Sequence, residues 1–249
     1  MGNLEQYRQV FVFGNQKSGT TAVAALLAKM SGCSSTLDIP PIWHNERALH
    51  DGTLALGDLV NEHPEYFNKC VIKEPCLTFL YDRLMPLFPN AAQVFVVRHP
   101  VENLRSILDR LETPGNLGND IDAKLYERFG AWKEVIDGRF LDVRHDHYVE
   151  RLAARWVRAA QFYLAHRDEM LLVRYEDFIQ DKVGVVKALV YALELEVVQT
   201  IIEAQHFQYQ PRGTNRGIDW KEFFGSGNLV RIRNIIAPYL ETFDYRLEV

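Results

Sequence analysis

The chain has 249 residues, 47% of them hydrophobic, which is the size and composition of a globular domain with a sizeable core. Its formal net charge of −5 argues against non-specific nucleic-acid binding. No apolar run approaches the roughly 20 residues that a membrane-spanning helix needs, and no signal peptide precedes the first predicted strand. If Met1 is the natural start, we expect a cytoplasmic protein with a single domain over residues 1–249 that acts away from membranes.

Strand and helix patterns alternate along the chain. Apolar runs that end in turn residues predict five strands, over Val10–Phe13, Ser34–Ile39, Cys70–Lys73, Gln93–Val97 and Met170–Val173. The predicted helices are Ala22–Met30, Leu54–His63, Thr78–Phe88, Val101–Leu111, Ala123–Val135 and Tyr148–Arg167. This order predicts an α/β fold of three layers, P-loop-like, with a central parallel sheet of about five strands and helices on both faces. Glu112–Asn119 is rich in Gly, Pro and Asn, and we expect a mobile flap there.

The loop after the first predicted strand has the composition of a phosphate-binding loop. Residues 10–21 are VFVFGNQKSGTT, so an apolar strand, a glycine turn and a helix start follow one another. Loop amides and the helix dipole favour a bound anion, most often a phosphate. Gly14 and Gly19 have the spacing of a Walker A loop, but Thr20 stands where that motif has its lysine. Lys17 lies on the rim instead, where its ammonium can reach a bridging or leaving-group oxygen.

A second candidate anion site follows the fourth predicted strand. Arg98 ends this strand, at the carboxyl edge of the sheet where α/β proteins bind ligands. Pro100 suits the first turn of the next helix, which places Ser106 on the same helix face as Glu102. A guanidinium fork suits a terminal phosphate, and the serine hydroxyl adds a donor.

These motifs together resemble those of the sulfotransferases that depend on PAPS (3′-phosphoadenosine 5′-phosphosulfate). KSGTT at 17–21 resembles the 5′-phosphosulfate loop of that family, and RHPVENLRS at 98–106 resembles its 3′-phosphate motif. VIKEP at 71–75, VRYEDF at 173–178 and PRGTNRGIDWKEFF at 211–224 extend the likeness. The resemblance implies PAPS as co-substrate, PAP as product and no metal. The cofactor contacts that it implies are Gln16, Lys17, Ser18, Gly19, Thr20, Thr21, Arg98, Ser106, Tyr175, Arg212 and Gly213.

The chain departs from the cytosolic phenol and steroid enzymes at several positions. Ala22 replaces the tryptophan that follows KSGTT in many of them, and Gln16 replaces the proline before the loop lysine. The lysine-x-histidine pattern is absent, because Pro75 stands two residues after Lys73. No clear match to their short C-terminal dimerisation motif is present, so the oligomeric state stays open. The chain resembles a divergent member, closer in style to bacterial or carbohydrate-type enzymes.

Sulfuryl transfer to a hydroxyl needs a base for the acceptor proton and positive charge for the transferring group and the leaving oxygen. Lys17 is placed for the leaving oxygen, and Lys73, at a neighbouring strand end, can stabilise the sulfuryl group or share the task of Lys17. Asp38, near the end of the second predicted strand, is the preferred base; a turn or helix cap is its alternative role. His44, Glu46 and Glu74 are the other candidates for the base.

The sequence leaves other functions open. A P-loop kinase or nucleotidase with an atypical loop would need Mg²⁺ and an acidic residue at a strand end, for which Glu176 and Asp177 are available. A nucleotide-binding module would bind PAP without transfer. Aromatic residues between the motifs favour a small-molecule hydroxyl acceptor: Trp43, Tyr126, Phe129, Trp132, Phe140 and Tyr148.

The cysteines and histidines give no sign of a metal site. Cys33, Cys70 and Cys76 are scattered and odd in number, and we expect reduced, structural thiols. His145 and His147 lie in a charged run that is typical of a solvated helix start. We therefore expect no metal.

Overall fold

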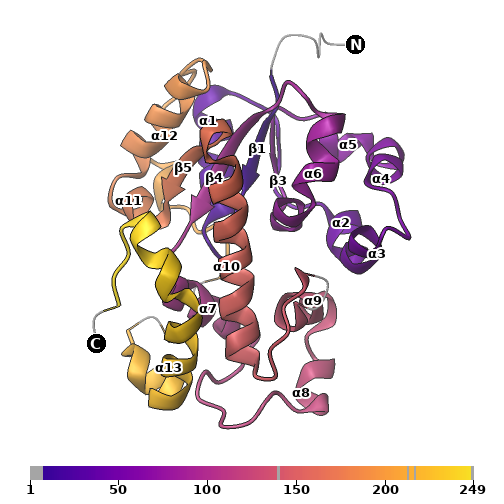
Figure 1. The fold of residues 1–249 in the computed structure, drawn as a ribbon. Helices are drawn as coiled ribbons and strands as arrows, with labels where there is room; N and C mark the ends of the chain where they lie inside the picture. Colours follow the sequence, from indigo (N-terminus) through magenta and orange to yellow (C-terminus); the bar gives the residue numbers. More distant parts are fainter. Residues whose placement is uncertain (1–7, 139–140, 212, 216, 248–249) are drawn as a thin grey trace. The chain divides into compact units, whose positions relative to one another are not determined.

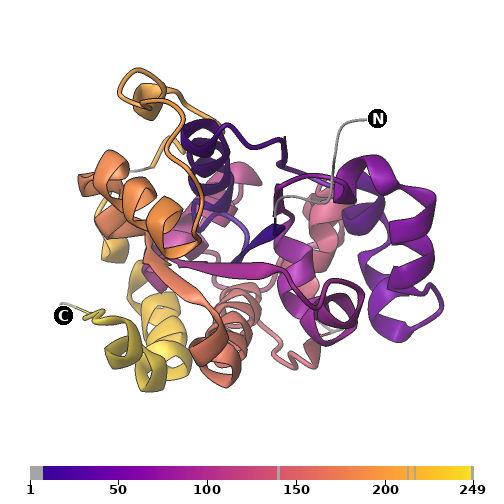
Figure 2. The same ribbon diagram turned by 90° about the horizontal axis from the view of Figure 1, so that it is seen from above.

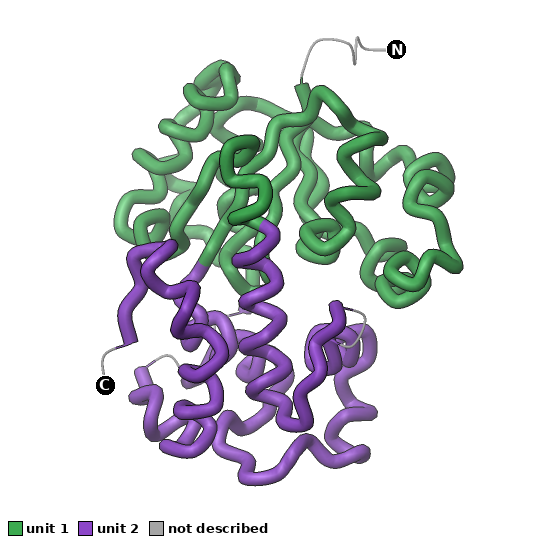
Figure 3. Tube along the Cα trace, in the orientation of Figure 1, with its two compact units in different colours: residues 1–97, 163–210 green, residues 98–162, 211–249 purple. Residues whose placement is uncertain are grey.

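A computed structural model describes residues 8–138, 141–211, 213–215 and 217–247. The chain falls into two compact units, each made of two chain segments (Figure 3). The first unit comprises Met1–Val97 and Tyr163–Gln210, and the second comprises Arg98–Phe162 and Pro211–Val249. A single domain over the whole chain stays a prediction.

The first unit is built on a parallel sheet of five strands in the order β2-β3-β1-β4-β5 (Figure 1). The strands are β1 Val10–Phe13, β2 Ser35–Thr36, β3 Val71–Lys73, β4 Ala92–Val97 and β5 Leu171–Arg174. Val10 pairs with Val71 on one side and with Ala92 on the other, so β1 is the central strand. The predicted α/β fold with a five-stranded parallel sheet is confirmed.

Side-chain alternation along β1 directs two kinds of packing to the two faces of the sheet. Val10 and Val12 belong to an apolar cluster with residues of α1 (Thr20–Ser31) and α12 (Lys182–Ala192). On the other face, the ring of Phe11 lies 5.1 Å from that of Phe88, and the ring of Phe13 lies 5.6 Å from that of Tyr81. Helices therefore cover both faces, as expected, and Figure 2 shows α1 and α12 together on one side.

Short helices fill the rest of the first unit. They are α2 Pro40–His44, α3 Glu46–Asp51, α4 Leu56–Glu62, α5 Pro64–Phe67, η2 Pro75–Leu80, α6 Tyr81–Leu84, η3 Met85–Leu87, η6 Arg167–Glu169, α11 Tyr175–Gln180 and η7 Ala204–His206. The stretch predicted as one helix over 78–88 is helical as far as Leu87, but it is divided among η2, α6 and η3. Pro86 has no backbone N–H to donate to the preceding turn, which accounts for the break before the predicted end. The predicted second strand is shortened to Ser35–Thr36.

The second unit is helical. It contains α7 Pro100–Arg110, α8 Ala123–Glu127, η4 Gly130–Trp132, α9 Lys133–Asp137, the first part of α10 Tyr148–His166, α13 Trp220–Leu240 and η8 Glu241–Phe243. The helix predicted over 123–135 is interrupted, since Gly130 adopts a left-handed conformation with φ of 54°. The backbone of α13 also leaves helical geometry, at Gly225, where φ is 70°.

The segment predicted as a flap is held by hydrogen bonds from two helices of its own unit. The Tyr148 hydroxyl donates to the Pro114 carbonyl over 2.8 Å and accepts from the Leu117 N–H. The Asn228 amide donates to the carbonyls of Gly115 and Leu117, at 2.9 Å each. The expectation of a mobile flap is therefore not supported by this packing, which anchors the loop through buried polar groups.

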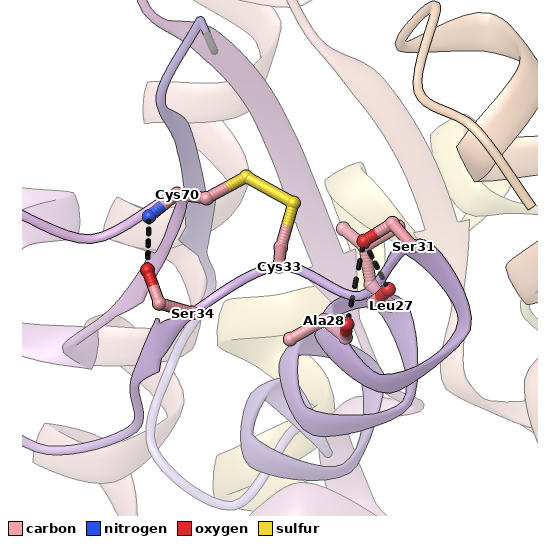
Figure 4. The surroundings of a disulfide bond; sticks show 6 residues. All are labelled: Leu27, Ala28, Ser31, Cys33, Ser34 and Cys70. Carbon is pink, nitrogen blue, oxygen red and sulfur yellow. Dashed lines mark hydrogen bonds between the residues drawn. A yellow bond between two sulfur atoms is a disulfide. The ribbon is translucent and has the colours of Figure 1, made fainter. Parts of the chain in front are cut away.

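The prediction of reduced thiols is wrong for two of the three cysteines. Cys33 and Cys70 form a disulfide with their Cα atoms 5.5 Å apart (Figure 4), whereas Cys76 is a buried free thiol. Register brings the two cysteines near each other: Ser35 of β2 lies opposite Val71 of β3, Cys70 directly precedes β3, and Cys33 lies two residues before β2. The bond therefore joins the chain after α1 to the start of β3, at the amino edge of the sheet.

None of the described helices is long and apolar enough to cross a membrane.

Candidate functional site

The loop from β1 to α1 has a backbone that only a few residue types adopt readily. Gly14 and Gly19 have φ values of 144° and 95°, and Lys17 also has a positive φ, of 66°. The Gly14 N–H donates to the Thr78 hydroxyl over 2.9 Å, and that hydroxyl donates back to the Gly14 carbonyl. Gln16 is buried, and its amide donates to the Cys76 sulfur. The segment after β3 thus fixes the first half of the loop.

The second half of the loop leads into the N-terminus of α1. Gly19 is the N-cap, and it offers no side chain to satisfy the first N–H groups of the helix. Ser18, Thr20 and Thr21 are buried around this turn. A helix start that lacks a side-chain cap and carries hydroxyl groups favours an anion from outside the loop.

Tyr175 packs against this helix start. It is the first residue of α11, directly after β5, and a Cβ on Gly19 would lie 2.6 Å from the Tyr175 ring atom Cε2. A side chain at position 19 would therefore overlap the tyrosine ring. The predicted cofactor residue Tyr175 and the predicted loop are thus brought together within the first unit.

Gln210 joins two side chains of the loop, and the sequence interpretation missed it. Its amide oxygen accepts a hydrogen bond from the Lys17 ammonium over 3.1 Å, and its amide nitrogen donates to the Thr21 hydroxyl over 3.1 Å. A glutamine so distant in sequence from the loop gives no pattern that could have revealed it. An anion bound by Lys17 and Thr21 would take over partners that Gln210 holds here.

Lys73 and Asp38 form an ion pair next to the loop, at the end of β3. The Lys73 ammonium lies 2.7 Å from Asp38 Oδ1 and donates to the Leu37 carbonyl over 2.8 Å. The lysine side chain is only 2% exposed, whereas that of Asp38 is 59% exposed. A buried ammonium is costly without a partner, and Asp38 supplies that partner while its own side chain stays open to solvent.

Glu74 is buried and serves the backbone. Its two carboxyl oxygens accept from the N–H groups of Ile39, at 2.9 Å, and Cys76, at 3.2 Å. The other two candidates for the base differ from it: His44 is exposed on α2 beside the Trp43 ring, and Glu46 is buried in the first turn of α3. Asp38 is thus the candidate that is both exposed and paired with Lys73.

Burial raises the pKa of the Glu74 carboxyl from 4.5 to about 7, against the opposing effects of Lys73 and the two N–H donors. A raised pKa in the folded state means that folded protein binds the proton more tightly than unfolded protein. The resulting stabilisation is complete below about pH 4.5 and is lost as the pH rises through about 7.

We therefore expect Glu74→Gln to remove a pH dependence of stability. Between about pH 4.5 and 7, the free energy of unfolding of the wild type should include a contribution that falls by at most about 1.4 kcal/mol per pH unit. The variant loses one acceptor and is less stable, but this contribution disappears. Urea unfolding across this range measures it. Glu65→Gln, at a side chain 60% exposed, is the matched control, and a Glu74→Gln variant with the wild-type slope would contradict the expectation.

In the second unit, Arg98 follows β4 directly and is buried, with 8% exposure. Its guanidinium lies 3.3 Å from Glu102 Oε2, and the Trp156 indole donates to the Arg98 carbonyl over 3.0 Å. Ser106 is half-buried on α7, one turn beyond Glu102. The predicted face of Glu102 and Ser106 is therefore present on a helix that begins at Pro100.

Part of the polar tail lies against α7. Arg105 donates to the Ile218 carbonyl over 2.6 Å, and the Asn215 amide donates to Asp109 over 2.5 Å. Gly213 also adjoins Asp109, since a Cβ on this glycine would overlap the carboxylate. Arg212 lies outside the described residues. Gly213 is thereby placed in the same unit as Arg98 and Ser106.

In the part of the chain that the structure describes, no group of three or more His, Cys, Asp or Glu side chains is arranged to hold a metal ion. The side chains that converge on the loop carry an ammonium, hydroxyls and an amide, which suit an oxyanion. The fold and the loop together define a parallel α/β protein with a candidate anion site at the carboxyl edge of its sheet.

Comparisons with known proteins agree with this class. The model of the Sulfotransferase family matches residues 43–199, more than half of the chain, and includes β3, β4, β5 and α7 but not the loop at 14–21. The chain therefore belongs to the sulfotransferase family. No curated protein matches it in sequence.

Three solved structures share the fold. Mouse sulfotransferase SULT7A1 complexed with PAP has 16% identity and a TM-score of 0.55, over 98% of this chain and 89% of that one. The sulfotransferase domain of the Synechococcus PCC 7002 olefin synthase has 15% identity and a TM-score of 0.52, over 98% of each chain. The sulfotransferase domain of the curacin biosynthetic pathway has 13% identity and a TM-score of 0.52, over 97% of this chain and 99% of that one.

Proposed function

We propose that this protein transfers a sulfuryl group from PAPS to a hydroxyl of a small-molecule acceptor. The observation that carries the proposal is the loop at 14–21. Lys17 and Thr21 are both hydrogen-bonded to the side-chain amide of Gln210, at the start of α1, which has no side-chain cap. Family membership supports sulfuryl transfer, and the mouse structure of the same fold contains PAP.

The residues of the loop fit the 5′-phosphosulfate group of such a nucleotide. The ammonium of Lys17, the hydroxyl of Thr21 and the N–H groups at the start of α1 are all suited to oxyanions. Tyr175, packed on Gly19, lies beside the same loop. Arg98 and Ser106 are proposed to bind the 3′-phosphate, by resemblance to the family motif and because a buried guanidinium favours a phosphate. The proposed role of Arg212 rests on the sequence alone.

Each proposed catalytic residue has a separate task. When bound, PAPS supplies the activated sulfuryl group. Asp38 accepts the proton of the acceptor hydroxyl while the hydroxyl oxygen bonds to sulfur. The bond from sulfur to the 5′-phosphate oxygen breaks, and Lys17 neutralises this oxygen, which leaves with the electron pair. Once Asp38 is protonated, its attraction for the Lys73 ammonium weakens, and Lys73 can stabilise charge on the transferring group.

The acceptor is proposed to be a small molecule that approaches Asp38. Of the aromatic residues considered for its pocket, Trp43 is half-buried and belongs to the same unit as Asp38. Tyr126 and Trp132 are also half-buried but belong to the second unit. Phe129 and Tyr148 are buried in that unit, where core packing accounts for them, and Phe140 lies outside the described residues. Trp43 is therefore the aromatic residue that we propose for acceptor contact.

We expect PAP to bind with micromolar or better affinity and to raise the melting temperature, because a ligand that binds only the folded state stabilises it. Thermal unfolding with PAP, and with ATP and Mg²⁺ as the comparison, measures this. Stabilisation by ATP and Mg²⁺ but not by PAP would favour the kinase alternative and overturn the sulfotransferase proposal. An acceptor screen with PAPS then separates an enzyme from a module that only binds PAP.

A further inference from the structure

One face of α7 is hydrogen-bonded to three residues of the polar tail, Asn215, Ile218 and Trp220. Glu102, Arg105 and Asp109 lie at positions i, i+3 and i+7 of the helix, which places them in one row. Glu102 accepts from the Trp220 indole over 2.7 Å, Arg105 donates to the Ile218 carbonyl, and Asp109 accepts from the Asn215 amide. The tail therefore runs antiparallel to the helix, and its register is fixed at three points.

The row is also bonded along the helix. Glu102 pairs with the buried guanidiniums of Arg98 and Arg105 as well as with Trp220. These bonds hold the pKa of the Glu102 carboxyl below its usual value despite its partial burial. Glu102 and Arg105 are therefore held in place by charge-assisted hydrogen bonds, which are stronger than those between neutral groups.

Asp109 contacts residues 213 and 215 of the tail, in the segment that includes Gly213, a proposed contact of the cofactor. It bonds the Asn215 side chain at 2.5 Å, and Gly213 packs so closely on its carboxylate that a Cβ at position 213 would require the Asp109 side chain to move. Ser106, proposed for the 3′-phosphate, lies on the preceding turn of the same helix. The position of the 213–215 turn relative to Ser106 is therefore set by Asp109.

We propose that Asp109 is a positioning residue for recognition of the 3′-phosphate, acting through Asn215 and Gly213. This inference rests on the proposed function. The change in PAP affinity on removal of the Asp109 carboxylate distinguishes this role from a purely electrostatic effect. Charge repulsion alone predicts tighter phosphate binding when a nearby carboxylate is removed. A positioning role instead predicts weaker binding when the carboxylate is removed.

The experiment compares PAP with adenosine 5′-phosphosulfate by calorimetric titration of Asp109→Ala, Asn215→Ala, the double variant and Asp109→Asn. For Asp109→Ala and Asn215→Ala we expect PAP affinity to fall roughly three- to ten-fold, the worth of one hydrogen bond, with little change for the nucleotide that lacks the 3′-phosphate. The double variant should lose no more than either single variant. Asp109→Asn retains an acceptor for Asn215 and should bind PAP almost as wild type does.

Asp168→Ala, at a side chain 96% exposed, controls for the loss of one negative charge, and melting temperatures confirm that each variant is folded. Tighter or unchanged PAP binding by Asp109→Ala, or an equal loss for both nucleotides, would overturn the inference alone. Wild-type protein that fails to bind PAP would overturn the proposed function, and the inference with it.

Discussion

Arg98→Ala is expected to weaken PAP binding by roughly ten- to 150-fold while affinity for adenosine 5′-phosphosulfate changes little. A charge-assisted bond from a guanidinium to a phosphate contributes roughly 1.5–3 kcal/mol, which corresponds to this range. Only PAP carries a 3′-phosphate, so the loss should be selective. Glu102 keeps its bonds to Arg105 and Trp220 after the substitution, so the start of α7 should stay folded.

Calorimetric titration with both nucleotides measures the effect, and Arg144→Ala is the matched control. Arg144 lies in the same unit with a side chain 88% exposed, so its removal subtracts the same charge without a buried contact. An equal loss for PAP and adenosine 5′-phosphosulfate in Arg98→Ala would place the arginine elsewhere than at the 3′-phosphate. Selective loss in both arginine variants would point to net charge rather than to a specific contact.

The regular elements that surround the loop could be predicted because local sequence dictates them. Val10–Phe13 is apolar and ends at Gly14, so a buried strand and a turn follow from these residues alone. The predicted helix at 22–30 lies within α1, which begins at Thr20. Arg98 is found directly after β4, because the apolar run ends there in the sequence as well as in the structure. These elements carry most of the proposed donor site.

Features that depend on pairing between distant segments could not be predicted. The disulfide depends on the register of β2 and β3, and β2 has only two residues. The bonds of Gln210 to Lys17 and Thr21 join segments with no shared pattern. The same holds for the row on α7: Asp109 looks like an ordinary surface carboxylate until Asn215 is placed beside it. Tertiary contacts, rather than local propensity, decide each of these cases.

The place of Asp38 near a strand end favours it as the base, and the structure adds a second reason that is not visible in the sequence. Its ion pair with the buried Lys73 links the proposed base to the proposed sulfuryl-stabilising cation. Glu74, which follows Lys73 in the sequence, has both carboxyl oxygens hydrogen-bonded to backbone N–H groups. The N–H of Ile39 is one of them, so Glu74 holds the residue next to Asp38. The two carboxylates thus have different tasks despite their proximity.

Asp38→Asn is expected to leave PAP binding nearly intact and to lower turnover by roughly 10²–10⁴, the usual contribution of a positioned base. The amide oxygen of asparagine can still accept from the Lys73 ammonium, so the geometry at the end of β3 should persist. The acid limb of the pH–rate profile should flatten. Lys17→Ala is the contrast: its interaction with the leaving oxygen grows as the bond breaks, so turnover should fall more than nucleotide affinity does.

Turnover against pH, with PAP affinity measured in parallel, tests this assignment once an acceptor is known. His44→Ala and Glu46→Gln are the comparison variants, because these residues are the competing candidates on α2 and α3. If Asp38→Asn keeps near-normal turnover while one of these two abolishes it, the base assignment moves to that residue. The proposal of PAPS-dependent transfer would survive that outcome, because it rests on Lys17, Thr21 and the loop at the start of α1, whose contacts do not involve the base.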